Sequence, residues 1–93
     1  MTYREFVDGL NCGTIKKASF SVENYAHYRN CVVEVNPSSP VGKIIVFYLT
    51  PDGYEKQGFF KKVKEDRKLF YLKNQGSFTL KQMWNRIKIH SIE

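Results

Sequence analysis

The first residues of the chain repeat apolar side chains at the spacing of a helix. Within residues 2–10 these side chains stand three or four positions apart, at Tyr3, Phe6, Val7 and Leu10. That spacing places them on one helical face. Thr2 precedes the pattern and Glu5 follows Thr2 by three residues, which is the arrangement of a capping box. The sequence therefore predicts a short N-terminal helix that ends at Asn11 and Gly13.

Two stretches in the first half favour strands. Residues 14–23 have a β-like composition, and residues 31–36 contain a pair of valines and then Val35 before Asn36 and Pro37 end the run. We therefore expect a strand in each stretch.

Two neighbouring stretches are less regular. Residues 21–30 allow a helical turn capped by Ser21 or the continuation of a strand, and the pattern leaves both open. Pro37 and Pro40 flank two serines, and proline disrupts regular hydrogen bonding. We expect an irregular loop over residues 37–42.

The second half predicts three hairpin-linked strands in order. Residues 43–50 are apolar on both faces, as in a strand that is buried centrally or bent through a barrel. The segment "TPDG" is a turn, with Pro and Gly in the central positions that suit them. Residues 54–63 are expected to return antiparallel, with Gly58 allowing sharp coiling. "KEDRK" then turns the chain, residues 68–73 form a strand, and "NQGS" turns the chain again.

The last stretch changes period. "TLKQMW" is long enough for a single helical turn. After it, Ile87 and Ile89 point one way, whereas Arg86, Lys88 and His90 point the other. This alternation predicts a final strand, which we expect to close the structure.

These elements predict an α+β fold. It has a short N-terminal helix, then a mainly antiparallel small β-barrel or strongly bent sheet with one helical turn before the last strand. From Gly42 to Glu93, the order of strands, "PDG" turn, internal glycine and helical turn resembles small β-barrels of the Sm-like or Src-homology-like kind. The resemblance implies a barrel. It transfers no RNA-binding residue, because "KEDRK" does not match the Asp and Asn of the Sm turn.

The chain is short enough for one domain. Its 93 residues allow a single core, since such cores commonly hold ~100–150 residues. We expect one domain over 1–93, with a neutral part at 1–36, the Pro/Ser loop at 37–42 and a basic β part at 43–93. The sequence has no long apolar run, and its first residues are charged, which predicts a cytoplasmic protein that does not enter a membrane.

Charge is concentrated in the second half. The formal net charge is +6; residues 1–40 hold four basic and four acidic side chains, whereas the rest holds eleven and five. Such an asymmetry is typical of a protein that binds a polyanionic partner.

The basic side chains interleave with aromatic ones around residues 58–74. Strand alternation would place Lys62 and Lys64 on the face of Phe60, and Lys61 on the other face. A solvated hairpin whose lysines protect a sheet edge is the alternative. The predicted binding residues are Lys61, Lys62, Lys64, Arg67, Lys68, Lys73, Phe60, Tyr71, Arg86 and Lys88.

Candidate metal ligands are few. His27 and Cys31 stand four apart, which would place both on one face of a helical turn. With Cys12 and His90 they make four possible zinc ligands. Ordinary buried thiols are the alternative, and we expect no cofactor. No catalytic motif is present, so we expect no enzyme.

These observations predict a non-enzymatic binding module that docks on nucleic acid or on an effector nucleoprotein. The alternative is a phage or mobile-element inhibitor that binds a host defence nucleoprotein stoichiometrically. In general character, as a short cytosolic chain without catalytic residues, the protein resembles anti-CRISPR proteins. A structural subunit without a ligand is a third reading, and the oligomeric state is left open.

Overall fold

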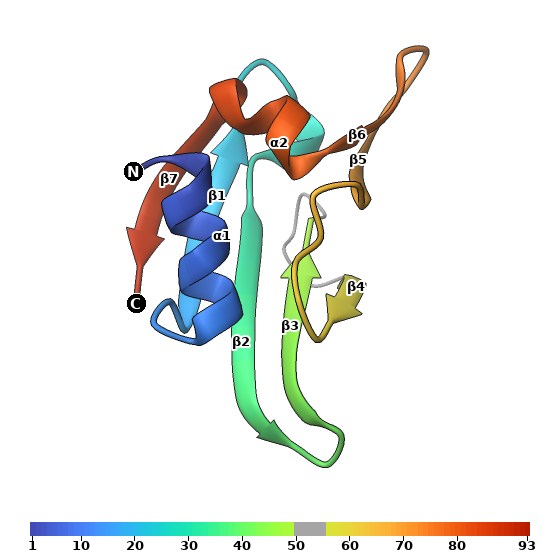
Figure 1. Ribbon diagram of the computed structural model, residues 1–93. Helices are drawn as coiled ribbons and strands as arrows, with labels where there is room; N and C mark the ends of the chain where they lie inside the picture. Colours follow the sequence, from blue (N-terminus) through green and yellow to red (C-terminus); the bar gives the residue numbers. More distant parts are fainter. Residues whose placement is uncertain (50–55) are drawn as a thin grey trace.

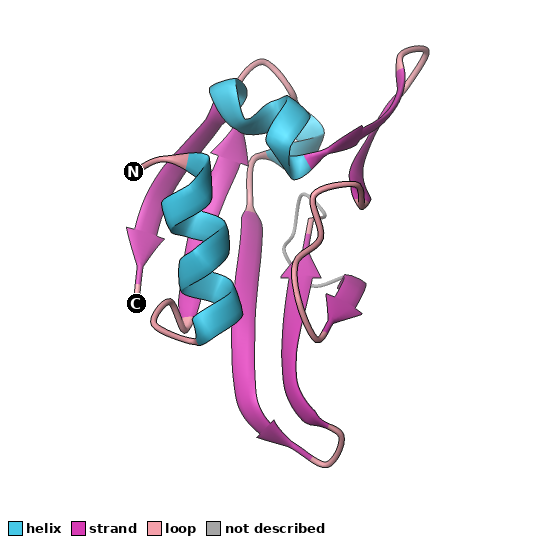
Figure 2. Ribbon diagram, viewed as in Figure 1, coloured by secondary structure: helices cyan, strands magenta, loops and turns pink. Residues whose placement is uncertain are grey.

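A computed structural model of the protein describes residues 1–49 and 56–93, and the side chains of 56–60 lie outside the description. The described strands form an open five-stranded antiparallel sheet, in the order β4-β3-β2-β1-β7, and a separate two-stranded sheet of β5 and β6. Helix α1 lies across one face of the larger sheet (Figures 1 and 2). In chain order the elements are α1 (Tyr3–Cys12), β1 (Lys17–Val22), the 3-10 helix η1 (Ala26–Tyr28), β2 (Cys31–Ser39), β3 (Gly42–Tyr48), β4 (Lys56–Phe60), β5 (Lys68–Leu72), β6 (Gly76–Thr79), α2 (Leu80–Met83), the 3-10 helix η2 (Trp84–Arg86) and β7 (Ile87–Ile92).

The N-terminal helix is confirmed together with its cap. The Thr2 hydroxyl accepts a hydrogen bond from the Glu5 backbone N–H, and the Glu5 carboxylate accepts one from the Thr2 N–H. The helix runs past Asn11 and stops at Gly13, whose φ of 83° suits a residue without a side chain. Its buried side chains are Phe6, Val7 and Leu10, so the predicted face points into the core.

The connection between β1 and β2 resolves the open stretch at residues 21–30. Strand β1 ends at Val22, and Asn24 adopts a positive φ of 67°. A single 3-10 turn, η1, follows before β2 begins. The stretch therefore contains the end of a strand and then a helical turn, and Ser21 does not cap that turn.

The Pro/Ser stretch is more regular than predicted. Strand β2 continues through Pro37 to Ser39 and pairs with β3, whose first residue is Gly42. The expected loop at 37–42 is therefore wrong for most of its length. The register shifts between Asn36 and Ser39, and such an irregularity accommodates a proline that lacks an N–H donor.

Strand β4 returns antiparallel to β3, as predicted, with Phe60 opposite Ile45 and Gly58 opposite Phe47. The predicted "TPDG" turn lies outside the described residues. Strand β4 ends at Phe60, so the alternation that we expected from Phe60 through Lys64 does not continue.

The second predicted hairpin has a different partner. Strand β5 pairs with β6 through the "NQGS" turn and does not pair with β4. Positive φ angles at Asn74 and Gly76 make this turn. The helical turn α2 is confirmed, but β7 pairs with β1 at the far edge of the larger sheet. The described strands leave that sheet open, and the barrel is not confirmed.

The core lies between one face of the larger sheet and the elements packed on it. Its largest fully buried side chains include Phe6 of α1, Phe20 of β1, Phe47 of β3 and Phe70 of β5. Trp84, half-buried, contacts the Phe6 ring with centroids 5.4 Å apart. Helix, sheet and hairpin thus share one core.

Candidate nucleic-acid interface

The connection between β4 and β5, together with Lys68, the first residue of β5, forms an exposed segment, residues 61–68, that we call the basic segment. Val63, at its middle, is only 5% exposed, and its backbone N–H donates to Asn11 Oδ1 at 2.8 Å. Glu65 also accepts a hydrogen bond from the Arg4 guanidinium. Two contacts with α1, at Asn11 and Arg4, therefore hold the segment, while its lysines stay exposed.

The lysines of the basic segment lack acidic partners in the described part of the chain. Of the acidic side chains close to them in sequence, Glu65 is paired with Arg4. None of the described ion pairs involves the four ammonium groups of Lys61, Lys62, Lys64 and Lys68. The positive charge of this surface is therefore available to a ligand.

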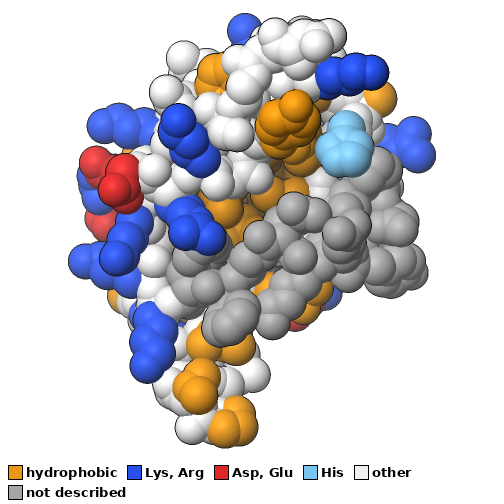
Figure 3. Space-filling view, turned by 90° about the vertical axis from the view of Figure 1, so that its right-hand side faces the viewer, with side chains coloured by type: hydrophobic (Ala, Val, Ile, Leu, Met, Phe, Trp, Pro, Cys, Tyr) orange, Lys and Arg blue, Asp and Glu red, His pale blue; other side chains and the backbone are white. Residues whose placement is uncertain are grey.

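Two adjoining hollows lie along the basic segment. One has a volume of about 290 Å³ and the other about 440 Å³, and both are lined by Lys64 and Arg67. Lys61 and Lys62 complete the first, whereas Asp66 and Lys68 complete the second. Figure 3 shows Lys and Arg side chains gathered along one side of the molecule, around a small acidic group. The arrangement is a track of cations, which is what a phosphate backbone requires.

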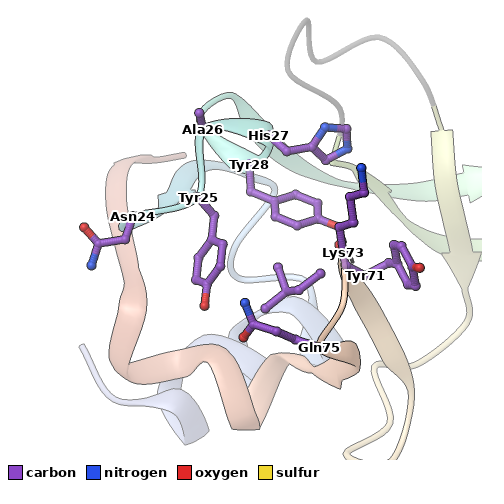
Figure 4. A pocket seen from close by; sticks show the side chains of 9 residues that line it. Asn24, Tyr25, Ala26, His27, Tyr28, Tyr71, Lys73 and Gln75 are labelled. Atoms are coloured by element: carbon purple, nitrogen blue, oxygen red, sulfur yellow. Dashed lines mark hydrogen bonds between the residues drawn. The ribbon is translucent and has the colours of Figure 1, made fainter.

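A further pocket of about 460 Å³ lies between η1 and the β5–β6 hairpin. Tyr71 of β5 is on its rim and 65% exposed. Lys73 lies in the hairpin turn and is exposed. The pocket is lined by Asn24, Tyr25, Ala26, His27, Tyr28, Tyr71, Leu72, Lys73 and Gln75 (Figure 4).

The structure brings together part of the predicted set. The five cations of the basic segment lie together, and Tyr71 and Lys73 share the hairpin that begins at its end. Arg86 donates a hydrogen bond to the Tyr25 hydroxyl at 2.5 Å, which places it beside the pocket. Lys88 lies on β7, at the edge of the sheet opposite β4. The side chain of Phe60 lies outside the description.

The sequence pattern does not identify Tyr25, just before η1, or Tyr28, within it, as site residues. Tyr25 and Tyr28 stand in "ENYAHY", an aromatic run that resembled ordinary strand or helix composition. The run of two tyrosines around a histidine was the available signal. Only the approach of the β5–β6 hairpin turns it into a pocket wall.

The structure does not assemble the proposed zinc ligands. Among the described residues, no group of three or more His, Cys, Asp or Glu side chains is placed to hold a metal ion. Cys31 begins β2 and is buried, while His27 is exposed on η1, so they share no helical face. His90 is hydrogen-bonded to Ser21, and Cys12 is exposed at the end of α1. The described residues therefore do not gather three of these four side chains into a metal site.

The fold and this surface define a small α+β protein with a basic, partly hollowed face. No protein-family model, curated protein or solved structure matches the chain. Among the described helices, none is both long and apolar enough to span a bilayer.

Proposed function

We propose that the protein is a non-enzymatic binding module that docks on nucleic acid, free or within a nucleoprotein, through the basic segment. The observation that carries the proposal is the set of four lysines there with no acidic partner among the described residues. Lysines in this state release counterions when they meet phosphates, which favours binding to any nucleic acid. Two free cysteines also fit a cytoplasmic location, where thiols stay reduced.

The anchoring of the segment supports the proposal. A loop held at Val63 and Glu65 presents its cations with less entropy to lose on binding than a free loop would. The exposed ring of Tyr71 adds a surface on which a base can stack.

The test is the salt dependence of binding to single- and double-stranded oligonucleotides. The variant changes Lys61, Lys62, Lys64 and Lys68 to Gln. A control variant removes the same charge elsewhere, by changing Lys16, Lys17, Arg29 and Lys81, which are exposed and lie outside the predicted binding set, to Gln. Each phosphate contact contributes a log–log slope of about −0.7 for single strands and about −0.9 for duplex. The first variant should flatten the slope by about 3, and the control should change it much less.

Two results would contradict the proposal. Equal flattening by both variants would mean that overall charge, and not the basic segment, attracts the nucleic acid. Absence of binding to every DNA and RNA at low salt would remove the proposal altogether.

A stoichiometric inhibitor of a host defence nucleoprotein is the second candidate, and the exposure of Tyr71 favours it. Large exposed aromatic side chains tend to dominate protein interfaces. For this function a partner should remain bound after nuclease treatment, and Tyr71→Ala should weaken its capture more than the lysine variant does.

A further inference from the structure

The pocket between η1 and the β5–β6 hairpin has the size and lining of a ligand site. Its volume of about 460 Å³ lies within the range of ~300–1,000 Å³ that is common for small-molecule sites. Figure 4 shows the rings of Tyr25 and Tyr28 on its two sides, and the buried side chain of Leu72 also lines it. A flat, unsaturated ligand fits such walls.

The Tyr28 wall is fixed from behind. The Tyr28 hydroxyl accepts a hydrogen bond from the Tyr71 backbone N–H at 2.7 Å and donates one to the Tyr71 carbonyl at 2.8 Å. The Tyr28 ring also meets Phe70 edge to face, with centroids 5.2 Å apart. The side chain is 5% exposed. Its position is therefore set before any ligand arrives.

The Tyr25 wall is held by Arg86. The guanidinium carbon lies 5.6 Å from the centre of the Tyr25 ring, and Nη1 donates to the Tyr25 hydroxyl. This contact also leaves a cation beside the pocket. A ligand that carries a negative group next to its flat part is favoured over a neutral one.

The rim supplies polar groups. The side-chain amides of Asn24 and Gln75 have no hydrogen-bond partner among the described residues. Figure 4 shows Lys73 extending toward His27, with the Tyr71 ring turned away on the other side of Lys73. Amides offer both donors and acceptors to the edge of a base, and Lys73 suits a phosphate.

We propose that this pocket takes one unpaired nucleobase, whose flat face stacks on the partly exposed ring of Tyr25, while the buried Tyr28 forms a fixed wall beside it. The amide of Gln75 meets the base edge, and Lys73 meets the adjoining phosphate. The inference rests on the proposed function, because the rest of the strand follows the basic segment at the other end of β5. It adds a ligand class: the nucleic acid is single-stranded where it meets the protein.

The experiment compares a single-stranded oligonucleotide that contains 2-aminopurine with a duplex of equal length. Tyr25→Leu keeps an apolar wall but removes the aromatic face, and Tyr48→Leu, on β3, is the matched aromatic control. Loss of one stacked base should weaken single-strand binding about tenfold or more. Duplex binding should stay within about twofold. The fluorescence quenching of 2-aminopurine on binding should fall in Tyr25→Leu and persist in Tyr48→Leu.

The outcomes separate this inference from the proposed function. If Tyr25→Leu leaves single-strand affinity and quenching unchanged, or weakens duplex equally, the pocket does not hold a base. The salt slope of the basic segment can still be intact in that case, and the proposed function stands. If the wild-type protein binds no nucleic acid, both this inference and the proposed function are refuted. If Tyr25→Leu unfolds at the same temperature as the wild type, its loss of binding is a local effect. If Tyr25→Leu shows no cooperative thermal unfolding, Gln75→Ala takes its place in the same assay.

Discussion

The thiols of Cys31 and Cys12 lie in two different environments. Cys31 is fully buried at the start of β2, and its thiol lies 3.6 Å from the Tyr28 carbonyl. Burial raises the pKa of the Cys31 thiol to about 12. Cys12 is exposed, and a hydrogen bond with Thr14 lowers the pKa of its thiol. Only Cys12 is therefore open to reaction in the native protein.

The Cys31 pKa predicts a loss of stability in alkali. An unfolded thiol ionises near 9.0 and the native one near about 12. Between these values the native state keeps a proton that the unfolded state has lost, so the free energy of unfolding falls as pH rises. Its contribution is complete below about pH 9. From about pH 8 to about pH 10.5, the wild type should lose about 1–2 kcal/mol more than Cys31→Ala does.

Urea unfolding at the two pH values measures this difference. Burial also raises the pKa of Tyr28, which acts in the same direction but is common to both proteins. Parallel losses in the wild type and Cys31→Ala would show that the Cys31 thiol is not the group responsible.

At the element scale, the β5–β6 hairpin depends on Tyr28. Both hydrogen-bonding groups of the Tyr71 backbone are satisfied by the Tyr28 hydroxyl. The hairpin is not part of the larger sheet. The Tyr28 hydroxyl therefore satisfies backbone hydrogen-bonding groups of β5, as a neighbouring strand does for β1.

Tyr28→Phe should release that attachment. It leaves the Tyr71 N–H and C=O without their partner, and such a loss costs about 1–3 kcal/mol. Hydrogen exchange of the Tyr71 amide should become faster. The exchange rates of amides in β1 and β2 should change only as far as the global stability changes. Tyr71→Phe is the control, since that hydroxyl has no partner among the described residues. Equal stability of Tyr28→Phe and the wild type would refute this role.

Local signals in the sequence were enough to predict α1, because Thr2, Glu5 and Gly13 act on their own neighbours. Which strands pair with one another was harder to predict. The pattern of residues 68–73 predicts a strand, but it does not say whether β4 or β6 lies beside it. The Val63–Asn11 hydrogen bond, which shapes the basic segment, joins residues 52 apart. Its lysines were predictable from charge, whereas the Tyr25–Tyr28 pocket required knowledge of what packs on η1.

At the scale of the whole molecule, α1 supplies a large share of the core. Phe6 and Leu10 are fully buried, and Asn11 holds the basic segment. A domain of this size buries only about 60–65% of its unfolded surface, so it has little core to spare. Removing residues 1–12 should therefore abolish cooperative unfolding.

Thermal unfolding of the truncated protein, followed by circular dichroism, measures that effect. Phe6→Ala offers a graded version, with an expected loss of about 3–5 kcal/mol. A truncated protein that melts as sharply as the full chain would show that α1 is a detachable arm.

The pairing of β1 with β7 has a consequence for how the protein is made. Strand β1 has two neighbours in the sheet, and one of them, Ile87–Ile92, leaves the ribosome long after the other. Until then the edge of β1 offers unpaired N–H and C=O groups to any passing strand. The hydrogen bonds from Lys16 N–H to the Glu93 carbonyl and from Glu93 N–H to the Lys17 carbonyl, both 2.7 Å, extend the contact of this strand with the start of β1. A nascent chain stalled before Ile87 would therefore leave the β1 edge open to aggregation, and pairing of β7 with β1 closes that edge.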